Sequence, residues 1–283
     1  MNYGIANQTG KPNVDQATKI VERAWEYGIR EYDTAQRYGE SENVLGNALR
    51  SLGLSSEVRV LTKLDPKLDH LNKAVLEQAV RGSLTRLDVP ILYGLMLHSE
   101  ESLELWERGL GDTLKGFITK GLTKHVGVSV YSPDKALLAL ESDGIDMVQL
   151  PSNITDRRFE KSRVFRLAES NGKQIYVRSV FLQGLLVMDS KNVPSNMQFA
   201  VEVLRKLDAL SRHTGLSKQE LALGYVKKAY PKTKIVFGVE NPGQIRGNLK
   251  SWERTLPHGC VERVQEEFGY VEERILNPVL WPN

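Results

Sequence analysis

The sequence predicts a (β/α)8 barrel, also called a TIM barrel, that forms a single domain over residues 1–283. Strand-type and helix-type hydrophobic patterns alternate along the chain, and no linker, low-complexity segment or charge run interrupts them. Alternation of this kind predicts a parallel sheet, and so many βα units in one chain favour a closed barrel over an open sheet. The length also fits, because one such barrel typically takes about 250 residues.

Short runs rich in apolar and β-branched residues predict the strands. They lie at residues 29–34, 58–64, 91–97, 125–130, 147–150, 175–180 and 233–239. An eight-stranded barrel needs one strand more, and residues 1–5 have no apolar run that could form it. We therefore expect the first barrel strand to be missing or truncated at the N-terminus, which would leave unpaired strand edges at 29–34 and 233–239.

Apolar residues spaced three and four apart predict the helices between these strands. In the first helix Ile20 and Ala24 share one face, and Gly28 follows as a stop signal. Helices are expected at residues 14–27, 42–52, 71–87, 103–120, 133–140, 161–171, 199–212, 218–230, 241–249 and 259–271. Ser217 and Glu220 have the spacing of a capping box at the start of one of them.

The composition argues against several classes of protein. Lys and Arg number 38 against 35 Asp and Glu, so a net charge of +3 gives no strong electrostatic case for binding nucleic acid. The longest mainly apolar stretch, residues 89–97, is far shorter than the roughly 20 residues of a membrane span. The lone Cys260 cannot form an intrachain disulfide, and the chain start has no signal-peptide pattern. We expect a cytoplasmic protein with a small-molecule substrate and no metal, membrane or nucleic-acid partner.

Polar residues close three consecutive predicted strands. Asp33, Lys63 and His98 end these strands, and Tyr38 lies in the loop after the first of them. In barrels of parallel strands the active site lies at the C-terminal strand ends. A phenol is a poor acid at pH 7 unless a nearby ammonium stabilises its phenolate. Together the four residues predict a site that donates a proton to a carbonyl oxygen.

Each of these residues also has a purely structural interpretation. Asp33 has the position of a cap or turn residue, and Tyr38 that of a packing residue at the surface. Lys63 fits a surface charge, and His98 fits a half-buried imidazole with satisfied hydrogen bonds. The structural interpretation is favoured for each residue alone, but their shared position on three consecutive strands favours a catalytic site.

A specific motif overlaps this site. Residues 33–42 read DTAQRYGESE and are followed by Gly46. Further matching segments follow in order at residues 61–63 (LTK), 97–98 (LH) and 127–129 (GVS), and at Gln149, Asn153 and Gly184. This series resembles the aldo-keto reductase family, of the bacterial NADP-dependent oxidoreductase type, whose signature is DTAxxYGxSE. The resemblance covers most of the chain.

The resemblance implies a role for each residue of the predicted site. Tyr38 would be the general acid, and Lys63 and Asp33 would be the pair that lowers its pKa. His98 would orient the substrate carbonyl. The implied reaction is NADPH-dependent reduction of an aldehyde or ketone, a small or sugar-like carbonyl, to an alcohol.

The resemblance also implies residues that hold the cofactor. Ser129 and Gln149 would bind the carboxamide of the nicotinamide ring, which supplies the hydride while the protein orients it. In the family, Asp33 lies on the second barrel strand, and a first strand that ends in Gly-Thr precedes the first helix. The sequence has no such segment before its first helix.

Residues 178–184 depart from the family pattern of tyrosine, serine and proline before the glycine. Arg178, followed by Ser179, takes the place of the aromatic ring that stacks on nicotinamide. A guanidinium can also stack on a ring, but it disfavours the cationic oxidised nicotinamide. We therefore expect a bias toward the reduced cofactor; the alternative is that Arg178 simply pairs with a carboxylate.

Residues 238–248 resemble the loop that holds the adenosine end of the cofactor, with Gly238, Gln244 and Asn248 at binding positions. Their place before a helix suits phosphate binding by backbone N–H groups. The positions that grip a 2′-phosphate in many relatives are not basic here, and Glu240 adds a negative charge. NADP (NADPH) is the expected cofactor with NAD as the alternative, and Arg246 is either a substitute cation or a surface residue.

Two rival interpretations stay open beside an NAD(P)H-dependent aldo-keto reductase. The first is a cofactor-binding or regulatory barrel protein with little turnover, which a missing strand would favour. The second makes Lys63 the Schiff-base lysine of a barrel aldolase, which needs a lysine with a lowered pKa and leaves Tyr38 unexplained.

Overall fold

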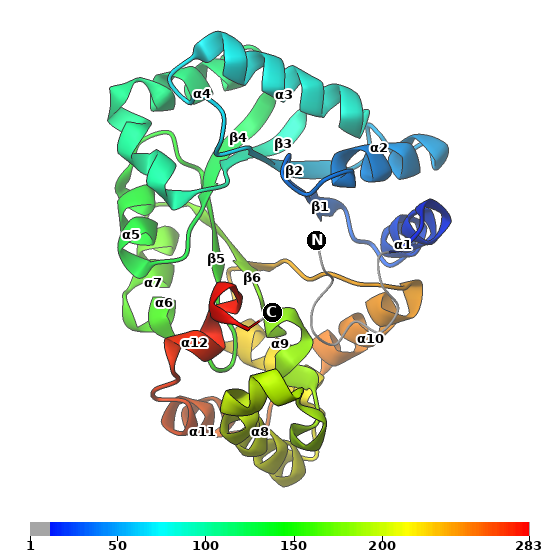
Figure 1. Cartoon of the computed structure of the whole chain (residues 1–283), viewed down its shortest axis with the longest axis vertical. Coiled ribbons are helices and arrows are strands. Elements are labelled where there is room, and N and C mark those ends of the chain that lie inside the picture. Colours follow the sequence, from blue (N-terminus) through cyan, green and yellow to red (C-terminus); the bar gives the residue numbers. More distant parts are fainter. Residues whose placement is uncertain (1–11, 283) are drawn as a thin grey trace. The chain divides into compact units, whose positions relative to one another are not determined.

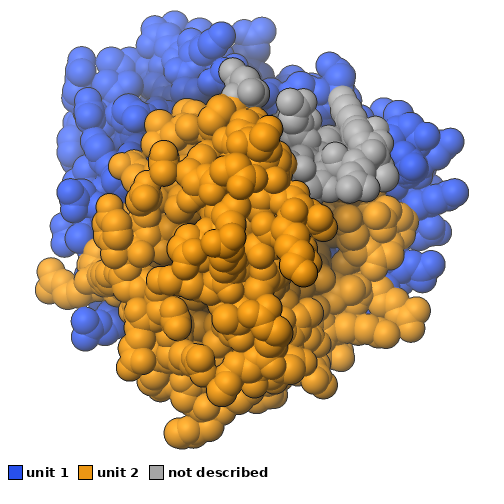
Figure 2. All heavy atoms as spheres, turned by 60° about the horizontal axis from the view of Figure 1, so that its bottom comes forward, with its two compact units in different colours: residues 1, 12–150, 164–176 blue, residues 2–11, 151–163, 177–283 orange. Residues whose placement is uncertain are grey.

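The computed structural model describes residues 12–282, which form two compact units (Figure 2). Of the described residues, unit 1 comprises 12–150 and 164–176, and unit 2 comprises 151–163 and 177–282. The segment in which a first barrel strand was expected to be missing or truncated, at the start of the chain, lies outside the described residues. The single-domain interpretation stays a prediction.

In unit 1 helices and strands alternate as the sequence predicts (Figure 1). The elements are α1 (Val14–Glu26), β1 (Glu31–Asp33), α2 (Ser41–Ser51), β2 (Arg59–Leu64), α3 (Lys73–Leu87), β3 (Leu92–Leu97), the 3-10 helix η1 (Glu100–Arg108), α4 (Leu110–Thr119), β4 (Thr123–Ser129), α5 (Pro133–Glu141), most of β5 (Met147–Pro151), α7 (Val164–Ser170) and the first part of β6 (Gln174–Arg178). Helix α3 packs against β2, and α4 packs against β4.

The strands pair in chain order, and their parallel direction puts the ends that carry the site at one edge. The hydrogen-bonded order runs from β1 to β7, and the pairs from β1 to β5 are parallel. Asp33 is in register with Leu61, and Ser129 is in register with Gln149. The C-terminal ends of these strands therefore share one edge of the sheet, where parallel α/β sheets place their active sites.

Glycines allow two close approaches inside unit 1. A Cβ atom at Gly127 of β4 would lie 2.4 Å from Cγ of Met147, so the methionine side chain occupies the space of a β4 side chain. A Cβ atom at Gly46 of α2 would lie 2.0 Å from the carbonyl oxygen of Arg86 in α3. Both distances are shorter than any van der Waals contact, so the positions require glycine. The glycine that follows the signature motif thus lets two helices pack backbone to backbone.

Local signals account for where the helices begin and break. Asn13 and Gln16 form a capping box at the start of α1. The helix expected at 103–120 is divided into η1 and α4 by Gly109, whose φ of 109° cannot continue a helix. The helix expected at 161–171 begins earlier and is broken at Arg163, whose φ is 67°.

Unit 2 begins with the ends of β5 and β6 and is mainly helical. It contains α6 (Arg158–Lys161), the 3-10 helices η2 (Leu182–Val187), η3 (Ser190–Asn192) and η4 (Ser195–Ala200), α8 (Val201–Thr214), α9 (Lys218–Ala229), β7 (Lys234–Ile235), α10 (Pro242–Glu253), α11 (Cys260–Glu267), α12 (Glu273–Leu276) and η5 (Pro278–Leu280). The capping box predicted from Ser217 and Glu220 is confirmed at the start of α9. Within residues 12–282, no helix combines the length and apolar character that crossing a membrane requires.

Candidate active site

A buried ion pair joins the C-terminal ends of β1 and β2. The Nζ atom of Lys63 lies 2.6 and 2.7 Å from the two carboxylate oxygens of Asp33, and it donates to the carbonyl oxygen of Thr34 at 3.0 Å. The side chain of Lys63 is 1% exposed and that of Asp33 is 14% exposed. Three oxygen acceptors match the three N–H groups of an ammonium, so the charge is held at one fixed place.

The rings of Tyr38 and His98 lie beside this ion pair. Nζ of Lys63 is 5.4 Å from the centroid of the Tyr38 ring. The rings of Tyr38 and His98 meet edge to face, with their centroids 5.4 Å apart and their planes at 82°. The structure therefore brings the four predicted catalytic residues, Asp33, Tyr38, Lys63 and His98, into one cluster in unit 1.

Gln36 anchors the loop that carries Tyr38. Its Oε1 atom accepts a hydrogen bond from the backbone N–H of Asp65 at 2.8 Å, and its Nε2 donates to Oγ of Ser83 in α3 at 2.9 Å. Its own backbone N–H donates to the carbonyl oxygen of Lys63 at 3.1 Å. The loop is thus tied to the strand that carries the lysine. Sequence reasoning missed Gln36, because it occupies a variable position of the signature.

Glu42, the last residue of the signature, anchors the other end of the same loop. Its buried carboxylate accepts a hydrogen bond from Oγ1 of Thr62 at 2.6 Å and pairs with the guanidinium of Arg86 at 2.7 Å. It therefore joins α2 to β2 and α3. Thr34 adds a further link at the loop's start, because its hydroxyl donates to Oγ of Ser41 at 2.9 Å.

Ser129, the last residue of β4, lies beside Gln149 in the middle of β5. Their exposed fractions are 2% and 1%, and their backbones are in register. A hydroxyl beside a carboxamide offers donors and acceptors that match a primary carboxamide, which is the nicotinamide group that the family resemblance implies for this pair. Nε2 of Gln149 also donates to Oδ1 of Asp33 at 2.8 Å, a contact that the sequence did not predict.

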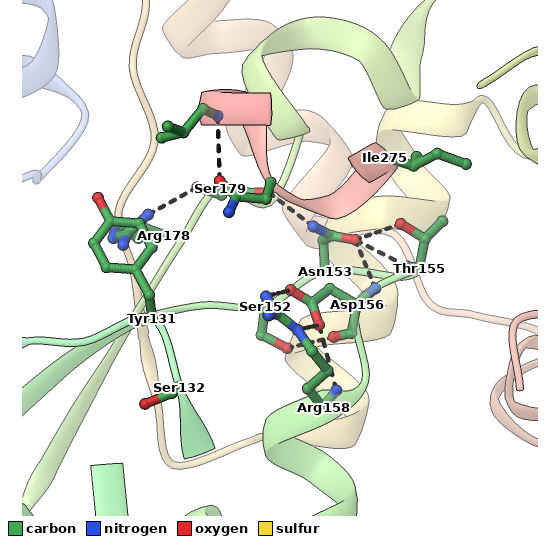
Figure 3. A network of polar contacts seen from close by, with 12 residues as sticks. Tyr131, Ser132, Ser152, Asn153, Thr155, Asp156, Arg158, Arg178, Ser179 and Ile275 are labelled. Atoms are coloured by element: carbon green, nitrogen blue, oxygen red, sulfur yellow. Dashed lines mark hydrogen bonds and ion pairs between the residues drawn. The ribbon is translucent and has the colours of Figure 1, made fainter. Parts of the chain in front are cut away.

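The next two predicted cofactor residues lie in unit 2, where Arg178 ends β6 and Ser179 follows it (Figure 3). Nη1 of Arg178 donates to Oγ of Ser179 at 3.3 Å. Ser179 has a φ of 62°, in the left-handed region that few residues other than glycine adopt. Its carbonyl oxygen accepts a hydrogen bond from Nδ2 of Asn153 at 3.2 Å.

The remaining predicted cofactor residues belong to the loop after β7 and to α10. Gly238 lies in the loop. The backbone N–H of Gln244 is capped by Oδ1 of Asn241 at 3.1 Å, and Oε1 of Gln244 accepts from the backbone N–H of Glu240 at 2.7 Å. Asn248 is buried, and its Oδ1 accepts from Nε2 of Gln219 at 2.5 Å. Residues 236–245 contain no Lys or Arg, so the first basic residue after β7 is Arg246 in α10.

Comparisons with known proteins identify relatives of this chain. The chain is 25% identical over 258 residues to aldo-keto reductase YhdN of Bacillus subtilis (strain 168), an alignment that covers 82% of this chain and 77% of that protein. It is 23% identical over an alignment of 305 residues to D-threo-aldose 1-dehydrogenase of Pseudomonas sp, which covers 94% of this chain and 93% of that protein.

A solved structure shows the same fold. It is an aldo/keto reductase from Klebsiella pneumoniae in complex with NADP and acetate; it has a TM-score of 0.73 and 18% sequence identity, and the match covers 90% of this chain and 86% of that chain. The likeness confirms the predicted barrel class. The family model described as "Aldo/keto reductase family" matches residues 1–267. The chain therefore belongs to the aldo/keto reductase family.

Proposed function

We propose that this protein reduces an aldehyde or ketone, a small or sugar-like carbonyl, to an alcohol with NAD(P)H, and that Tyr38 is the general acid. The cluster of Tyr38 with the buried Lys63–Asp33 pair and His98 carries the proposal. A fixed ammonium beside a phenol stabilises the phenolate, and this makes the phenol a proton donor near neutral pH.

The reduction adds one hydride and one proton to the C=O bond, and each residue of the site has a separate role in it. A nicotinamide held by the cofactor residues would supply the hydride for the carbonyl carbon. Tyr38 gives its hydroxyl proton to the carbonyl oxygen, and the Lys63 ammonium stabilises the phenolate that remains. Asp33 holds Lys63 in place, and His98, whose ring touches the Tyr38 ring, orients the carbonyl oxygen.

The cofactor residues in this proposal are Ser129, Gln149, Arg178, Ser179, Gly238, Gln244 and Asn248. The NADP bound in the Klebsiella pneumoniae relative supports a nicotinamide cofactor. NADPH is the cofactor that we propose first, with NADH as the alternative. Two observations favour testing both cofactors. Residues 236–245 have no basic side chain, and the acidic Glu240 lies among them.

The contacts of Lys63 speak against the Schiff-base alternative. A lysine that attacks a carbonyl must be uncharged, and this normally requires an apolar pocket or a neighbouring cation. Lys63 instead donates to both carboxylate oxygens of Asp33.

The name D-threo-aldose 1-dehydrogenase, borne by one relative, favours a sugar-like substrate for a redox reaction.

The substitution Tyr38→Phe tests the proposed acid. Loss of NADPH and NADH absorbance is followed with a panel of aldehydes, ketones and aldoses. We expect kcat to fall at least about a hundredfold, because general acid catalysis contributes on the order of 10² to 10⁴. Cofactor affinity should stay unchanged, because the ring remains.

Other outcomes would select the rivals. Turnover that survives intact in Tyr38→Phe rejects the acid. Tight cofactor binding by the wild type without turnover on any carbonyl supports a regulatory protein. Borohydride trapping of a substrate on Lys63 supports the aldolase.

A further inference from the structure

The segment that follows β6 has a strained backbone. Ser179, Leu182 and Gln183 have φ values of 62°, 46° and 53°, and the glycine after them, Gly184, has a φ of 90°. Non-glycine residues avoid this region because the Cβ atom clashes with the backbone. Several such residues within one short segment persist only where the surroundings hold them, and strain of this kind is typical of ligand-binding loops.

The carbonyl oxygen of Ser179 is the point at which this segment is held. It accepts a hydrogen bond from the backbone N–H of Leu182 at 2.9 Å, which closes the turn. It accepts a second from Nδ2 of Asn153 at 3.2 Å, which ties the turn to the segment after β5. Leu182 is itself buried, so the turn is fixed on two sides.

Hydrogen bonds hold the side-chain amide of Asn153 in one orientation. The residue is fully buried, and its Oδ1 atom accepts from the backbone N–H and the hydroxyl of Thr155 and from the backbone N–H of Asp156 (Figure 3). These three donors fix Oδ1 and therefore the opposite end of the amide. The buried carboxylate of Asp156 is in turn paired with Arg158 at 2.8 Å, which steadies the same turn.

We propose that Asn153 is a positioning residue, which holds residues 179–184 in the conformation that binds the nicotinamide cofactor. This proposal rests on the proposed function, in which Arg178 and Ser179 contact the cofactor. The hydrogen bond from Asn153 offsets the backbone strain before the cofactor arrives. Without it the segment relaxes to other conformations, and the cofactor must restore the strained one at the expense of affinity.

The substitution Asn153→Asp isolates the hydrogen bond to Ser179. Aspartate keeps an oxygen for Thr155 and Asp156 but turns its other oxygen toward the Ser179 carbonyl, which cannot donate to it. Thr155→Val is the matched control, because it removes one hydrogen bond of the same turn and leaves the Ser179 contact. Asn153→Ala removes the amide donor, together with the Oδ1 acceptor, without adding a buried charge, and it replaces the aspartate variant should that variant not fold.

Two measurements on the cofactor-free and cofactor-bound protein provide the readout. Kd values for NADPH and NADH are measured by fluorescence, and hydrogen exchange is followed for the amides of residues 180–186. We expect Asn153→Asp to raise at least tenfold the Kd of the cofactor that the wild type binds more tightly. It should also speed hydrogen exchange in this segment. Saturating cofactor should restore protection. Thr155→Val should keep the wild-type affinity.

A rescue experiment separates positioning from general damage. Gln183 is exposed, and Gln183→Gly removes strain at a φ of 53°. Added to Asn153→Asp, it should recover part of the lost affinity. Unchanged affinity and exchange in Asn153→Asp, or faster exchange throughout the chain with no rescue, would overturn the proposal. A wild type that binds neither NADPH nor NADH would instead overturn the proposed function.

Discussion

At the scale of residues, burial makes the two members of the Lys63–Asp33 pair unequal. Lys63 is 1% exposed, whereas the Asp33 carboxylate is 14% exposed and has a second donor in Gln149. An ion that loses its partner in a protein interior keeps its full desolvation cost. The stability of the fold should therefore fall more when the carboxylate is lost than when the ammonium is lost.

We predict that Asp33→Ala lowers the free energy of unfolding more than Lys63→Met does. Asp33→Ala leaves a buried ammonium beside the Thr34 carbonyl, which should cost about 3–5 kcal/mol. Lys63→Met leaves the Asp33 carboxylate with the Gln149 donor and some access to water. We therefore expect it to lower the free energy of unfolding by about 1–3 kcal/mol. Urea unfolding measures both. The double variant should lose less than the sum of the two, and a larger loss for Lys63→Met would contradict the argument.

At the scale of elements, the close contact between α2 and α3 depends on the absence of a side chain at Gly46. We predict that Gly46→Ala destabilises the protein by about 2 kcal/mol or more, because a methyl group 2.0 Å from the Arg86 carbonyl oxygen must push the helices apart. Gly116→Ala in α4 is the control, because nothing lies within 4 Å of the added atom. It should stabilise the helix by up to about 1 kcal/mol. Thermal or urea unfolding distinguishes the two, and a neutral Gly46→Ala would contradict the packing.

The sequence predicts the alternation of elements well because hydrophobic periodicity is a local property. It does not predict the 3-10 helices between residues 182 and 200, which have no regular period. Nor does it predict the break at Arg163, because arginine carries no signal for a positive φ. The strand expected at 233–239 shortens to β7 (Lys234–Ile235), followed by one more hydrogen bond from Val236 to Val177.

The candidate site was predictable where its residues lie at or next to the C-terminal ends of strands, as Asp33, Lys63 and His98 do. The contact of Gln149 with Asp33 was not, because it joins residues 116 positions apart and depends on how the strand ends converge. The anchoring of the Tyr38 loop by Gln36 was not predictable for the same reason, because it also joins residues that are distant in the sequence. Spacing identifies which residues share an edge, but the partners of each side chain follow from tertiary packing.

At the scale of the whole molecule, one carboxylate joins distant parts of unit 2. Glu160 of α6 accepts hydrogen bonds from Arg157, from the hydroxyls of Tyr225 and Tyr230 at 2.7 and 2.9 Å, and from Gln265 of α11 at 2.6 Å. Burial alone would raise the pKa of Glu160, but the hydrogen bonds from Arg157 and the two tyrosines lower it to about 2. Burial, followed by the hydrogen bond to Glu160, raises the pKa of Tyr225.

The lowered pKa of Glu160 predicts that acid weakens the fold over a defined range. The folded value of about 2 lies below the ordinary value of 4.5, so the folded state binds fewer protons than the unfolded one, and the stabilisation is complete above about pH 5. It should fall as the pH drops from about 5 to about 2, by about 3 kcal/mol in total. Urea unfolding at a series of pH values measures this slope. Glu160→Gln, which keeps the shape but cannot titrate, should be less stable at neutral pH and should show a shallower slope between about pH 5 and pH 3. If the slopes of the two proteins coincide, other carboxylates drive the acid response, and the Glu160 contacts contribute packing without charge.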